Sequence, residues 1–492
     1  MKLSNLLAEI SFYIKEVPKN FQEDLLIKDI KSNHKEVNNG DLFICIKGNT
    51  FDGHQFAKKA ERRGAVIIFS EKYVDVSIPV VVLSSTKDAL AKIAAVFFKH
   101  PSKKLKLFGI TGTNGKTTVS YLLNTIFTLQ DQGTGVIGTI ETKIHNQTFK
   151  NKHTTPDVIT LQRTLYQMVQ EKVQLVFIEV SSHALALGRV HGCEFDVAIF
   201  TNLSQDHLDF HKTMENYAYS KSLLFSQLGS SYHGGNKKYV IINKDDKLAN
   251  FFINSTAQHV LTYGNSSKAD LWAKDIHLTN KGSQFTMVTP LGEIQIISPL
   301  LGSFNVSNML ASAGAAIVQG VPLEIIQKAF KTTVGIPGRF EIVSSESNYT
   351  VIVDYAHTPE ALEKVLKTIK TFAKGKVFVV VGCGGNRDQS KRFPMAKAAV
   401  DNASYAIFTS DNPRFEDPNK IVHQMIDPLK AQNYTVELDR KKAIYLAIRL
   451  ANNNDIILIA GKGHETYQEI KGVKYDFDDR LVAAEAIHKK EN

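Results

Sequence analysis

The residues best suited to chemistry lie in a glycine- and threonine-rich stretch at 109–118, with the sequence GITGTNGKTT. An apolar run at 105–110 predicts a buried strand before it, and helical spacing follows at 119–127. A strand, a glycine turn and a helix N-terminus form a phosphate cradle, because free backbone N–H groups and the helix dipole favour an anion. We therefore predict that Lys116 contacts the β- and γ-phosphates of a nucleotide and that Thr117 offers its hydroxyl to Mg²⁺.

The spacing departs from the standard phosphate-loop motif G-x-x-x-x-G-K-[ST], because Ile110 stands at the first glycine position. A short Gly/Thr turn beside a lysine can also be an ordinary loop, but the flanking strand and helix favour the phosphate interpretation. A second stretch, GTGVIG at 133–138, matches the dinucleotide fingerprint. Strand-like sequence at 139–144 follows it where that fingerprint requires a helix, so we interpret the match as a coincidence.

Further polar side chains follow apolar strands. Glu179 ends the run LVFIE at 175–179, and a carboxylate at the carboxyl end of a strand near a phosphate loop is typical of a magnesium site. The run VAIF at 197–200 leads into TNLSQDHLDFH at 201–211. Its two histidines and two aspartates predict a loop that binds metal and substrate, with a plain polar turn as the alternative.

One lysine occupies an apolar helical stripe. Met214, Tyr217, Lys221, Leu224 and Leu228 follow one another at spacings of three and four. Lysine is rarely buried without a partner, and burial lowers its pKa. On spacing alone, we favour the alternative that Lys221 extends along the edge of the stripe to water.

Three later strands end in loops rich in Gly, Asp and Arg, at 382–388, 409–414 and 460–466. Ligands of open α/β sheets bind at the carboxyl edge, where we expect these loops to meet. This region has no phosphate cradle of its own. We therefore expect the site to lie between it and the region of the phosphate loop.

The elements that position these residues alternate between strand and helix, which predicts an α/β fold with mainly parallel sheets. A chain of 492 residues with 43% hydrophobic content exceeds a single core. We predict a small α/β domain at 1–100, a central parallel-sheet domain at 101–335 with the phosphate loop, and a Rossmann-like domain at 336–492. The linkers lie near the Pro-Ser pair at 101–102 and the Gly/Pro stretch at 335–339.

Composition limits the class of protein. The three cysteines are widely separated, which argues for a reducing compartment and against disulfides or a zinc knuckle. No charged-then-apolar leader or apolar run of membrane-spanning length is present, so we expect a soluble, cytoplasmic protein. We further expect a monomer. The net charge of +10 permits nucleic-acid binding, but the lysines are dispersed, and an anionic small substrate explains the charge equally well. We expect no nucleic-acid partner.

In their order along the chain, these motifs resemble the Mur ligase family of cell-wall peptide synthetases. The matching stretches are TGTNGKTT at 111–118, TTPD at 154–157, EVSSH at 179–183, TNLSQDHLD at 201–209, FNVSN at 304–308, PGRFE at 337–341 and DYAHTP at 354–359. Three more stretches, at 382–392, 411–414 (DNPR) and 461–465 (GKGHE), resemble the family member that adds the third residue of the stem peptide. Within that member, DNPR is the variant associated with meso-diaminopimelate.

The resemblance implies a three-domain architecture and ATP-driven amide formation. ATP would phosphorylate the D-glutamate carboxylate of UDP-N-acetylmuramoyl-L-Ala-D-Glu, and the amino group of meso-diaminopimelate would attack the acyl phosphate. Lys116, His207 and Lys221 match catalytic residues, and Mg²⁺ would be held by Thr117, Glu179, His207 and Lys221. The resemblance implies that Lys221 is buried and carbamylated by CO₂, in contrast to the interpretation from spacing.

The resemblance also implies three sets of ligand contacts. The ATP contacts are Gly112, Thr113, Asn114, Gly115, Lys116, Thr117, Thr118, Asn305, Arg339 and Asp354. The UDP-substrate contacts are Thr154, Thr155, Ser182 and Arg189. The diaminopimelate contacts are Arg387, Asp411, Asn412, Pro413, Arg414, Gly461 and Glu465.

The sequence departs from the family pattern at two places. Asn33-His34-Lys35 replaces the family's D-S-R near the uracil site, and Leu187 replaces a glutamine. Two rival functions are a folylpolyglutamate synthetase, which shares the phosphate loop but should lack DNPR and the 382–392 loop, and a nucleic-acid-dependent ATPase. The second predicts steeply salt-dependent binding to DNA or RNA.

Overall fold

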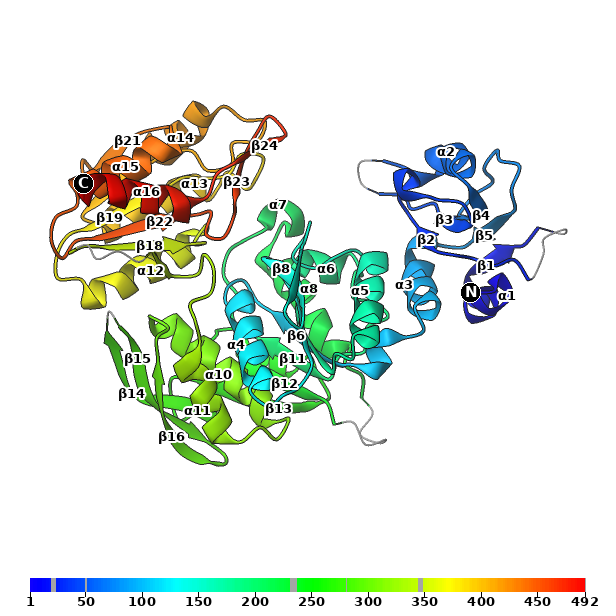
Figure 1. Ribbon diagram of the computed structural model, residues 1–492, viewed down its shortest axis with the longest axis horizontal. Coiled ribbons are helices and arrows are strands. Elements are labelled where there is room, and N and C mark those ends of the chain that lie inside the picture. Colours follow the sequence, from blue (N-terminus) through cyan, green and yellow to red (C-terminus); the bar gives the residue numbers. More distant parts are fainter. Residues whose placement is uncertain (19–23, 49–50, 231–236, 280, 344–347, 492) are drawn as a thin grey trace. The chain divides into compact units, whose positions relative to one another are not determined.

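The computed structural model describes residues 1–18, 24–48, 51–230, 237–279, 281–343 and 348–491. Contacts divide the chain into two compact units, residues 1–109 with 132–196, and residues 110–131 with 197–492. The division falls inside β6 (Lys106–Thr111), because Gly109 belongs to the first unit and Ile110 to the second. Each unit combines helices with sheets that contain parallel strands, which confirms the predicted α/β class (Figure 1). The domain boundaries near residues 100 and 335 stay predictions.

The first unit begins with a five-stranded sheet of order β1-β5-β4-β3-β2, parallel except for β1. Successive side chains of a strand point to opposite faces. In β3, Leu42 and Ile44 belong to the core formed with α1 and α3, whereas Phe43 packs with α2 on the other face. The elements are α1 (Leu3–Glu9), β1 (Ile14–Glu16), β2 (Ile30–Lys31), β3 (Asp41–Ile44), α2 (Ala57–Arg62), β4 (Ala65–Ser70), β5 (Val80–Leu83) and α3 (Thr86–Phe97).

The remainder of the first unit contains β7 (Thr134–Ile137), which pairs in parallel with β10 (Leu175–Glu179). The strands β8 (Glu141–Ile144) and β9 (Gln147–Lys150) continue antiparallel from β7. Because a strand and not a helix follows 133–138, the interpretation of the dinucleotide match as a coincidence is confirmed. The helices are α5 (Val158–Gln170) and α6 (Ser182–Ala186).

The second unit places α4 (Lys116–Thr128) directly after the phosphate loop. Its strands β11 to β14 pair in parallel, and β14 to β16 form an antiparallel meander. The small side chains of α10 allow it to pack closely against α4 and the strands β12 and β13. The elements are β11 (Val197–Phe200), α7 (Leu208–His211), α8 (Met214–Ser226), β12 (Tyr239–Asn243), α9 (Ala249–Ile253), β13 (His259–Gly264), β14 (Leu271–Thr279), β15 (Gly282–Thr289), β16 (Gly292–Ser298), α10 (Ser303–Ile317) and α11 (Leu323–Thr332).

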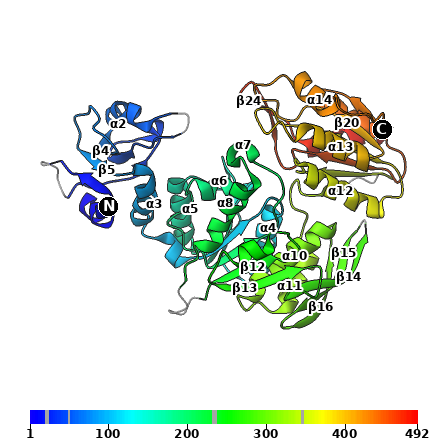
Figure 2. The same ribbon diagram turned by 180° about the vertical axis from the view of Figure 1, so that it is seen from behind.

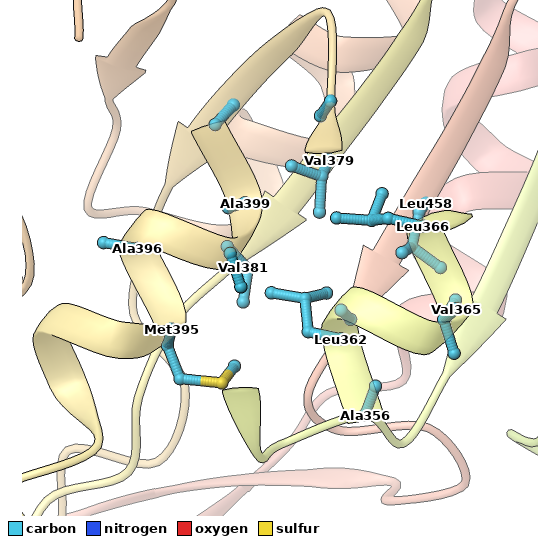
Figure 3. Packing of buried hydrophobic residues seen from close by; sticks show 14 of the residues in the cluster. Ala356, Leu362, Val365, Leu366, Val379, Val381, Met395, Ala396, Ala399 and Leu458 are labelled. Atoms are coloured by element: carbon cyan, nitrogen blue, oxygen red, sulfur yellow. The ribbon is translucent and has the colours of Figure 1, made fainter. Parts of the chain in front are cut away.

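The C-terminal part of this unit has a six-stranded sheet of order β17-β18-β22-β19-β20-β21, parallel except for β17. Figure 1 shows α15 and α16 on one face, and Figure 2 shows α12 and α13 on the other. Figure 3 shows Leu362 of α12 directed toward Val381 of β19 in the second of these cores. The elements are β17 (Glu341–Val343), β18 (Thr350–Asp354), α12 (Pro359–Phe372), β19 (Val377–Val381), α13 (Arg392–Asn402), β20 (Tyr405–Phe408), α14 (Pro418–Ile426), β21 (Tyr434–Val436), α15 (Arg440–Leu450), β22 (Ile456–Ala460), β23 (Tyr467–Ile470), β24 (Val473–Asp476) and α16 (Asp479–Glu491).

Candidate active site

The phosphate loop needs its glycines for steric reasons. Gly112 and Gly115 have φ angles of 147° and 90°, in the region that side chains disfavour. A Cβ atom on Gly112 would lie 1.9 Å from Thr201 Oγ1, and one on Gly115 would lie 2.4 Å from Asn308 Oδ1. Two other sequence motifs, at 201–209 and 304–308, therefore contact this loop directly. The N-cap of α4 is Gly115, which has no side chain of its own to cap the helix, and a helix N-terminus favours an anion.

Hydrogen bonds fix the loop against the segment after β11. The backbone N–H of Asn114 donates to Asn202 Oδ1 at 3.0 Å, and Thr201 Oγ1 donates to the Asn114 carbonyl at 2.6 Å. Lys116 Nζ donates to the carbonyl oxygens of Gly112 and Thr113 at 2.8 and 2.9 Å. Lys116, which we predict to bind phosphate, therefore lies over the loop at 109–118.

Asn305, a predicted ATP contact, is connected to this loop through another asparagine. Asn308 Nδ2 donates to Asn305 Oδ1 at 3.0 Å, and Asn305 Nδ2 donates to the Leu301 carbonyl at 2.9 Å. Asn308 in turn contacts Gly115. The sequence motif included Asn308, but its contact with a loop nearly two hundred residues earlier has no local signal.

Lys221 is buried, with 1% of its surface exposed, so the preference from spacing alone for an extension to water was wrong, and the burial that the resemblance implies is observed. The physical reason is that α8 packs this position against the phosphate loop, where Nζ donates to the Gly112 carbonyl at 2.9 Å. Nζ also lies 4.5 Å from the centre of the Tyr217 ring. Burial and the nearby Lys116 ammonium hold the pKa of Lys221 well below its usual value, although Asp206 acts in the opposite direction.

Asp206 was not predicted as an individual site residue, although it lies in the 201–211 loop. It is buried, with Oδ2 at 3.4 Å from His207 Nε2 and 3.6 Å from His357 Nε2. Burial alone would raise the pKa of this carboxyl group. Its contact with His357 and the positive charges of the two histidines and Lys391 outweigh burial and hold the pKa well below its usual range.

Arg339 and Asp354 lie at the junction of the 337–341 and 354–359 motifs. Arg339 Nη2 donates to Thr117 Oγ1 at 3.2 Å, and its guanidinium lies 4.4 Å from the centre of the Tyr355 ring. Asp354 accepts from the backbone N–H of Phe340 at 2.7 Å, and burial raises its pKa. Within the described residues, the buried Nε of Arg339 has no hydrogen-bond partner, so it is a donor available to a ligand.

In the first unit, Glu179 lies among residues that we predict to contact the UDP substrate and among the neighbours of those residues. Its Oε2 accepts from Thr139 Oγ1 at 2.8 Å, and the hydroxyl oxygens of Thr139 and Thr154 lie 3.1 Å apart. Thr155 Oγ1 donates to the Glu179 carbonyl at 2.7 Å, and Arg189 Nη1 donates to the Thr155 carbonyl at 3.0 Å. These contacts bring Glu179, Thr154, Thr155 and Arg189 into one cluster.

Gly138 and Ser182 complete this region. A Cβ atom on Gly138 would lie 2.2 Å from Glu179 Oε1, which explains the last glycine of the coincidental fingerprint. Ser182 is buried at the start of α6, and Leu187 follows that helix.

Residues 33–35 are the other place where the sequence departs from the family pattern. Asn33 accepts from the Lys35 N–H, and the His34 ring stacks on Phe56 with 4.3 Å between ring centres.

The three C-terminal loops follow β19, β20 and β22, which are adjacent parallel strands, so the prediction that they meet at one edge is confirmed. Asn412 Nδ2 donates to Glu465 Oε2 at 2.8 Å. The fully buried Lys462, which the sequence did not single out, donates to Asn412 Oδ1 at 3.1 Å and to Glu465 Oε2 at 3.0 Å.

Arg414 and Asp411 join the same cluster. Arg414 Nη1 donates to the Gly385 carbonyl at 2.8 Å, and a Cβ atom on Gly461 would lie 2.8 Å from Asp411 Oδ2. Desolvation would raise the pKa of Asp411, but the positive charges of Lys462, Arg440 and Arg414 hold it below its usual value.

Pro413 and Arg387 border this cluster. The Pro413 carbonyl would lie 2.0 Å from a Cβ atom on Gly385, so close packing requires the glycine. Arg387 lies exposed on the 382–388 loop. Thus the predicted residues of these loops form one cluster, with Arg387 at its exposed margin.

Neither a clustered metal site nor a membrane-spanning helix is found among the described residues. Within those ranges, no group of three or more His, Cys, Asp or Glu side chains is placed to hold a metal ion, so the predicted Mg²⁺ ligands stay predictions. No helix in the part of the chain that the structure describes has the length and apolar character to cross a membrane.

Comparisons with known proteins connect these features to one family. Three family models match in succession: "Mur ligase family, catalytic domain" at residues 27–106, "Mur ligase middle domain" at 110–316 and "Mur ligase, glutamate ligase domain" at 338–463. The chain is 51% identical over 471 residues to the UDP-N-acetylmuramoyl-L-alanyl-D-glutamate–2,6-diaminopimelate ligase of Bacillus cereus, which covers 96% of this chain and 95% of that protein.

Solved structures give the same picture for the fold. A structure of a UDP-N-acetylmuramoyl-L-alanyl-D-glutamate–2,6-diaminopimelate ligase matches with a TM-score of 0.70 and 32% identity, and covers 100% of this chain and 99% of that one. Folylpolyglutamate synthase from Mycobacterium tuberculosis, solved with ADP and AMPPCP, matches with a TM-score of 0.62 and 16% identity over 75% of this chain and 91% of that one. The second likeness concerns the fold alone.

Proposed function

Because this chain belongs to the Mur ligase family, we propose that it is the ATP-dependent ligase that adds meso-diaminopimelate to UDP-N-acetylmuramoyl-L-alanyl-D-glutamate in peptidoglycan synthesis. The observation on which this proposal rests is the 51% identity, across nearly the whole chain, to a relative named for that reaction. The clustering of Asn412, Arg414 and Glu465 agrees with it, since these side chains suit an amino acid with charged groups at both ends.

The first step is phosphoryl transfer from ATP to the D-glutamate carboxylate, with release of ADP. Catalysis of this step consists mainly of positioning and charge stabilisation. Lys116 and the N-terminus of α4 would stabilise the β- and γ-phosphates, while Arg339 offers its unpartnered Nε. The amino group of diaminopimelate then attacks the acyl phosphate, which forms the amide and releases phosphate and a proton.

We propose that Mg²⁺ binds beside the phosphate loop. Thr117 has a hydroxyl oxygen, and the buried Lys221 has a lowered pKa that favours the neutral amine. A neutral amine takes up CO₂ to give an anionic carbamate and one proton, and the carbamate on Lys221 would attract the charged Lys116. In this proposal Thr117, Glu179, His207 and carbamylated Lys221 hold the ion, whose charge would favour phosphoryl transfer.

We also propose that the protein acts in the cytoplasm, which agrees with three cysteines that form no disulfide. The monomeric state stays a prediction. Its partners in this proposal are its small-molecule substrates.

The test is phosphate release by the purified protein with ATP, Mg²⁺ and UDP-N-acetylmuramoyl-L-alanyl-D-glutamate, with meso-diaminopimelate or L-lysine as the acceptor. We expect release to require all components and to be much faster with meso-diaminopimelate. Equal rates with L-lysine would contradict the proposed acceptor. A folylpolyglutamate synthetase would instead require a folate and glutamate, and a nucleic-acid-dependent ATPase would respond to DNA or RNA.

A further inference from the structure

An ion pair lies beside the cluster of Asn412, Arg414 and Glu465. Glu469, in β23, belongs to none of the motifs identified in the sequence, yet its Oε2 lies 3.3 Å from Arg414 Nε. The two side chains are 24% and 19% exposed, so this pair is more sheltered than an ordinary surface ion pair.

The backbone holds both residues in place independently of this pair. The Arg414 N–H donates to the Glu469 carbonyl at 3.0 Å, and the Lys471 N–H donates to the Arg414 carbonyl at 2.6 Å. The Glu469 N–H donates to Asn412 Oδ1 at 2.9 Å. Removing only the Glu469 carboxylate therefore leaves the hairpin of β23 and β24 attached to the loop.

The guanidinium of Arg414 is held on two of its three nitrogens. Glu469 contacts Nε, and the Gly385 carbonyl accepts from Nη1 at 2.8 Å. Among the described residues, no hydrogen bond from Nη2 to protein is present. Because a guanidinium is planar, fixing Nε and Nη1 also fixes the direction of Nη2.

The neighbouring charges are paired in the same way. Lys462 Nζ lies 3.0 Å from Glu465 Oε2, so Lys462 and Arg414 each have a carboxylate beside them. A ligand end that bears both a carboxylate and an ammonium is neutral overall and matches such a site. A ligand end with a carboxylate alone adds a negative charge that no ammonium of the ligand offsets. Repulsion from the Glu469 carboxylate then opposes the binding of that ligand.

We infer that Glu469 is a positioning residue that determines specificity for the third amino acid. It orients the Arg414 guanidinium and offsets its charge, so that the site selects a distal end with both a carboxylate and an ammonium over one with a carboxylate alone. This inference rests on the proposed function, because it assumes that diaminopimelate is the acceptor.

The test compares kcat/KM for meso-diaminopimelate and for 2-aminopimelate, which keeps the reacting amino acid end and the distal carboxylate but lacks the distal ammonium. Wild type should prefer diaminopimelate. Glu469→Gln keeps the shape of the side chain and removes its charge. It should reduce the preference for diaminopimelate by roughly tenfold, mainly through the KM for the acceptor, and should leave the KM for ATP unchanged. Glu469→Asp keeps the charge and should retain the preference. The matched control Glu485→Gln removes an exposed pair with Lys441 in the same part of the chain and should leave the ratio unchanged.

The possible outcomes separate the two proposals. An active wild type whose ratio is the same in Glu469→Gln would overturn the role of Glu469 and leave the proposed function standing. That role would also be overturned if Glu469→Gln lowered KM equally for both acceptors, because Glu469 would then only compete for Arg414. A wild type that is inactive with both acceptors would overturn the proposed function and this inference together.

Discussion

Lys116 and Lys221 both donate to the carbonyl oxygen of Gly112, at 2.8 and 2.9 Å. Two ammonium groups on one acceptor repel each other, and only Lys221 is fully buried. The less costly arrangement keeps Lys116 charged and Lys221 neutral. In the proposed function the two lysines therefore have different roles, since a charged amine suits phosphate and a neutral amine suits CO₂.

For Lys116→Ala, we predict loss of ligation with the fold intact. The substitution removes a charge from the β- and γ-phosphates, and loss of such a stabilising group costs about 3–4 kcal/mol of barrier, or two to three decades in kcat. Phosphate release under saturating substrates measures the effect. The exposed Lys104→Ala is the control and should retain full activity. Turnover near that of wild type in Lys116→Ala would contradict the role of this loop.

For Lys221→Ala, we predict a folded and nearly inactive protein that short-chain carboxylic acids partly restore. Acetate would occupy the place of the carbamate and return an anionic oxygen beside the phosphate loop. Wild-type activity should also fall when dissolved CO₂ is removed. The control is Lys116→Ala, which acetate should not restore, because that variant lacks a cation. Failure of acetate to restore Lys221→Ala, together with no response of wild type to CO₂, would exclude the carbamate.

At the scale of elements, the sequence predicted which loops meet but not what holds them. The loops after β19, β20 and β22 could be placed at one edge because apolar runs followed by Gly, Asp and Arg are local signals. The burial of Lys462 depends on segments distant in the sequence, and no local spacing reveals it. The same holds for the pairing of Arg414 with Glu469. Spacing placed Lys221 on an apolar stripe, but only the family resemblance implied that it is buried.

The start of the C-terminal helix is fixed by a fully buried ion pair. Arg440 of α15 donates from Nη2 to Asp479 of α16 at 2.7 Å and to the Ala460 carbonyl of β22 at 2.9 Å. One arginine thus connects two helices with the strand that leads into the 460–466 loop. Burial alone would lower the pKa of Arg440, but the charge of Asp479 and its hydrogen bond outweigh burial and raise that pKa.

For Asp479→Ala, we predict that the amides of α15 and α16 lose about 3–5 kcal/mol of protection against hydrogen exchange, because the variant leaves a buried charge unpaired. The double variant Arg440→Met/Asp479→Leu replaces the pair with apolar groups and should recover much of that loss. The exposed Glu485→Gln is the control and should leave protection unchanged. If the single and double variants lost equal protection, the charge of Arg440 would not be the cause.

At the scale of the whole molecule, the C-terminal sheet has its own core on each face. Among the described residues, the cluster beneath α15 and α16 consists entirely of residues between 343 and 487. Of the residues that the structure describes, the cluster beneath α12 and α13 takes only Leu301 and Phe304 from outside the predicted domain at 336–492. A region that buries its own apolar side chains on both faces of a sheet meets the usual requirement for independent folding.

We therefore predict that residues 336–492 fold when expressed alone. Urea unfolding should be cooperative, because both cores are retained, while phosphate release should be absent, because the loop at 109–118 is missing. A fragment of residues 360–492 is the matched control. It lacks β17 and β18, which removes Val351 and Val353 from one core and Ile352 from the other, and it should not unfold cooperatively. If the longer fragment also failed to fold, the predicted boundary near residue 335 would be wrong, and the contacts of Leu301 would be required for the C-terminal sheet.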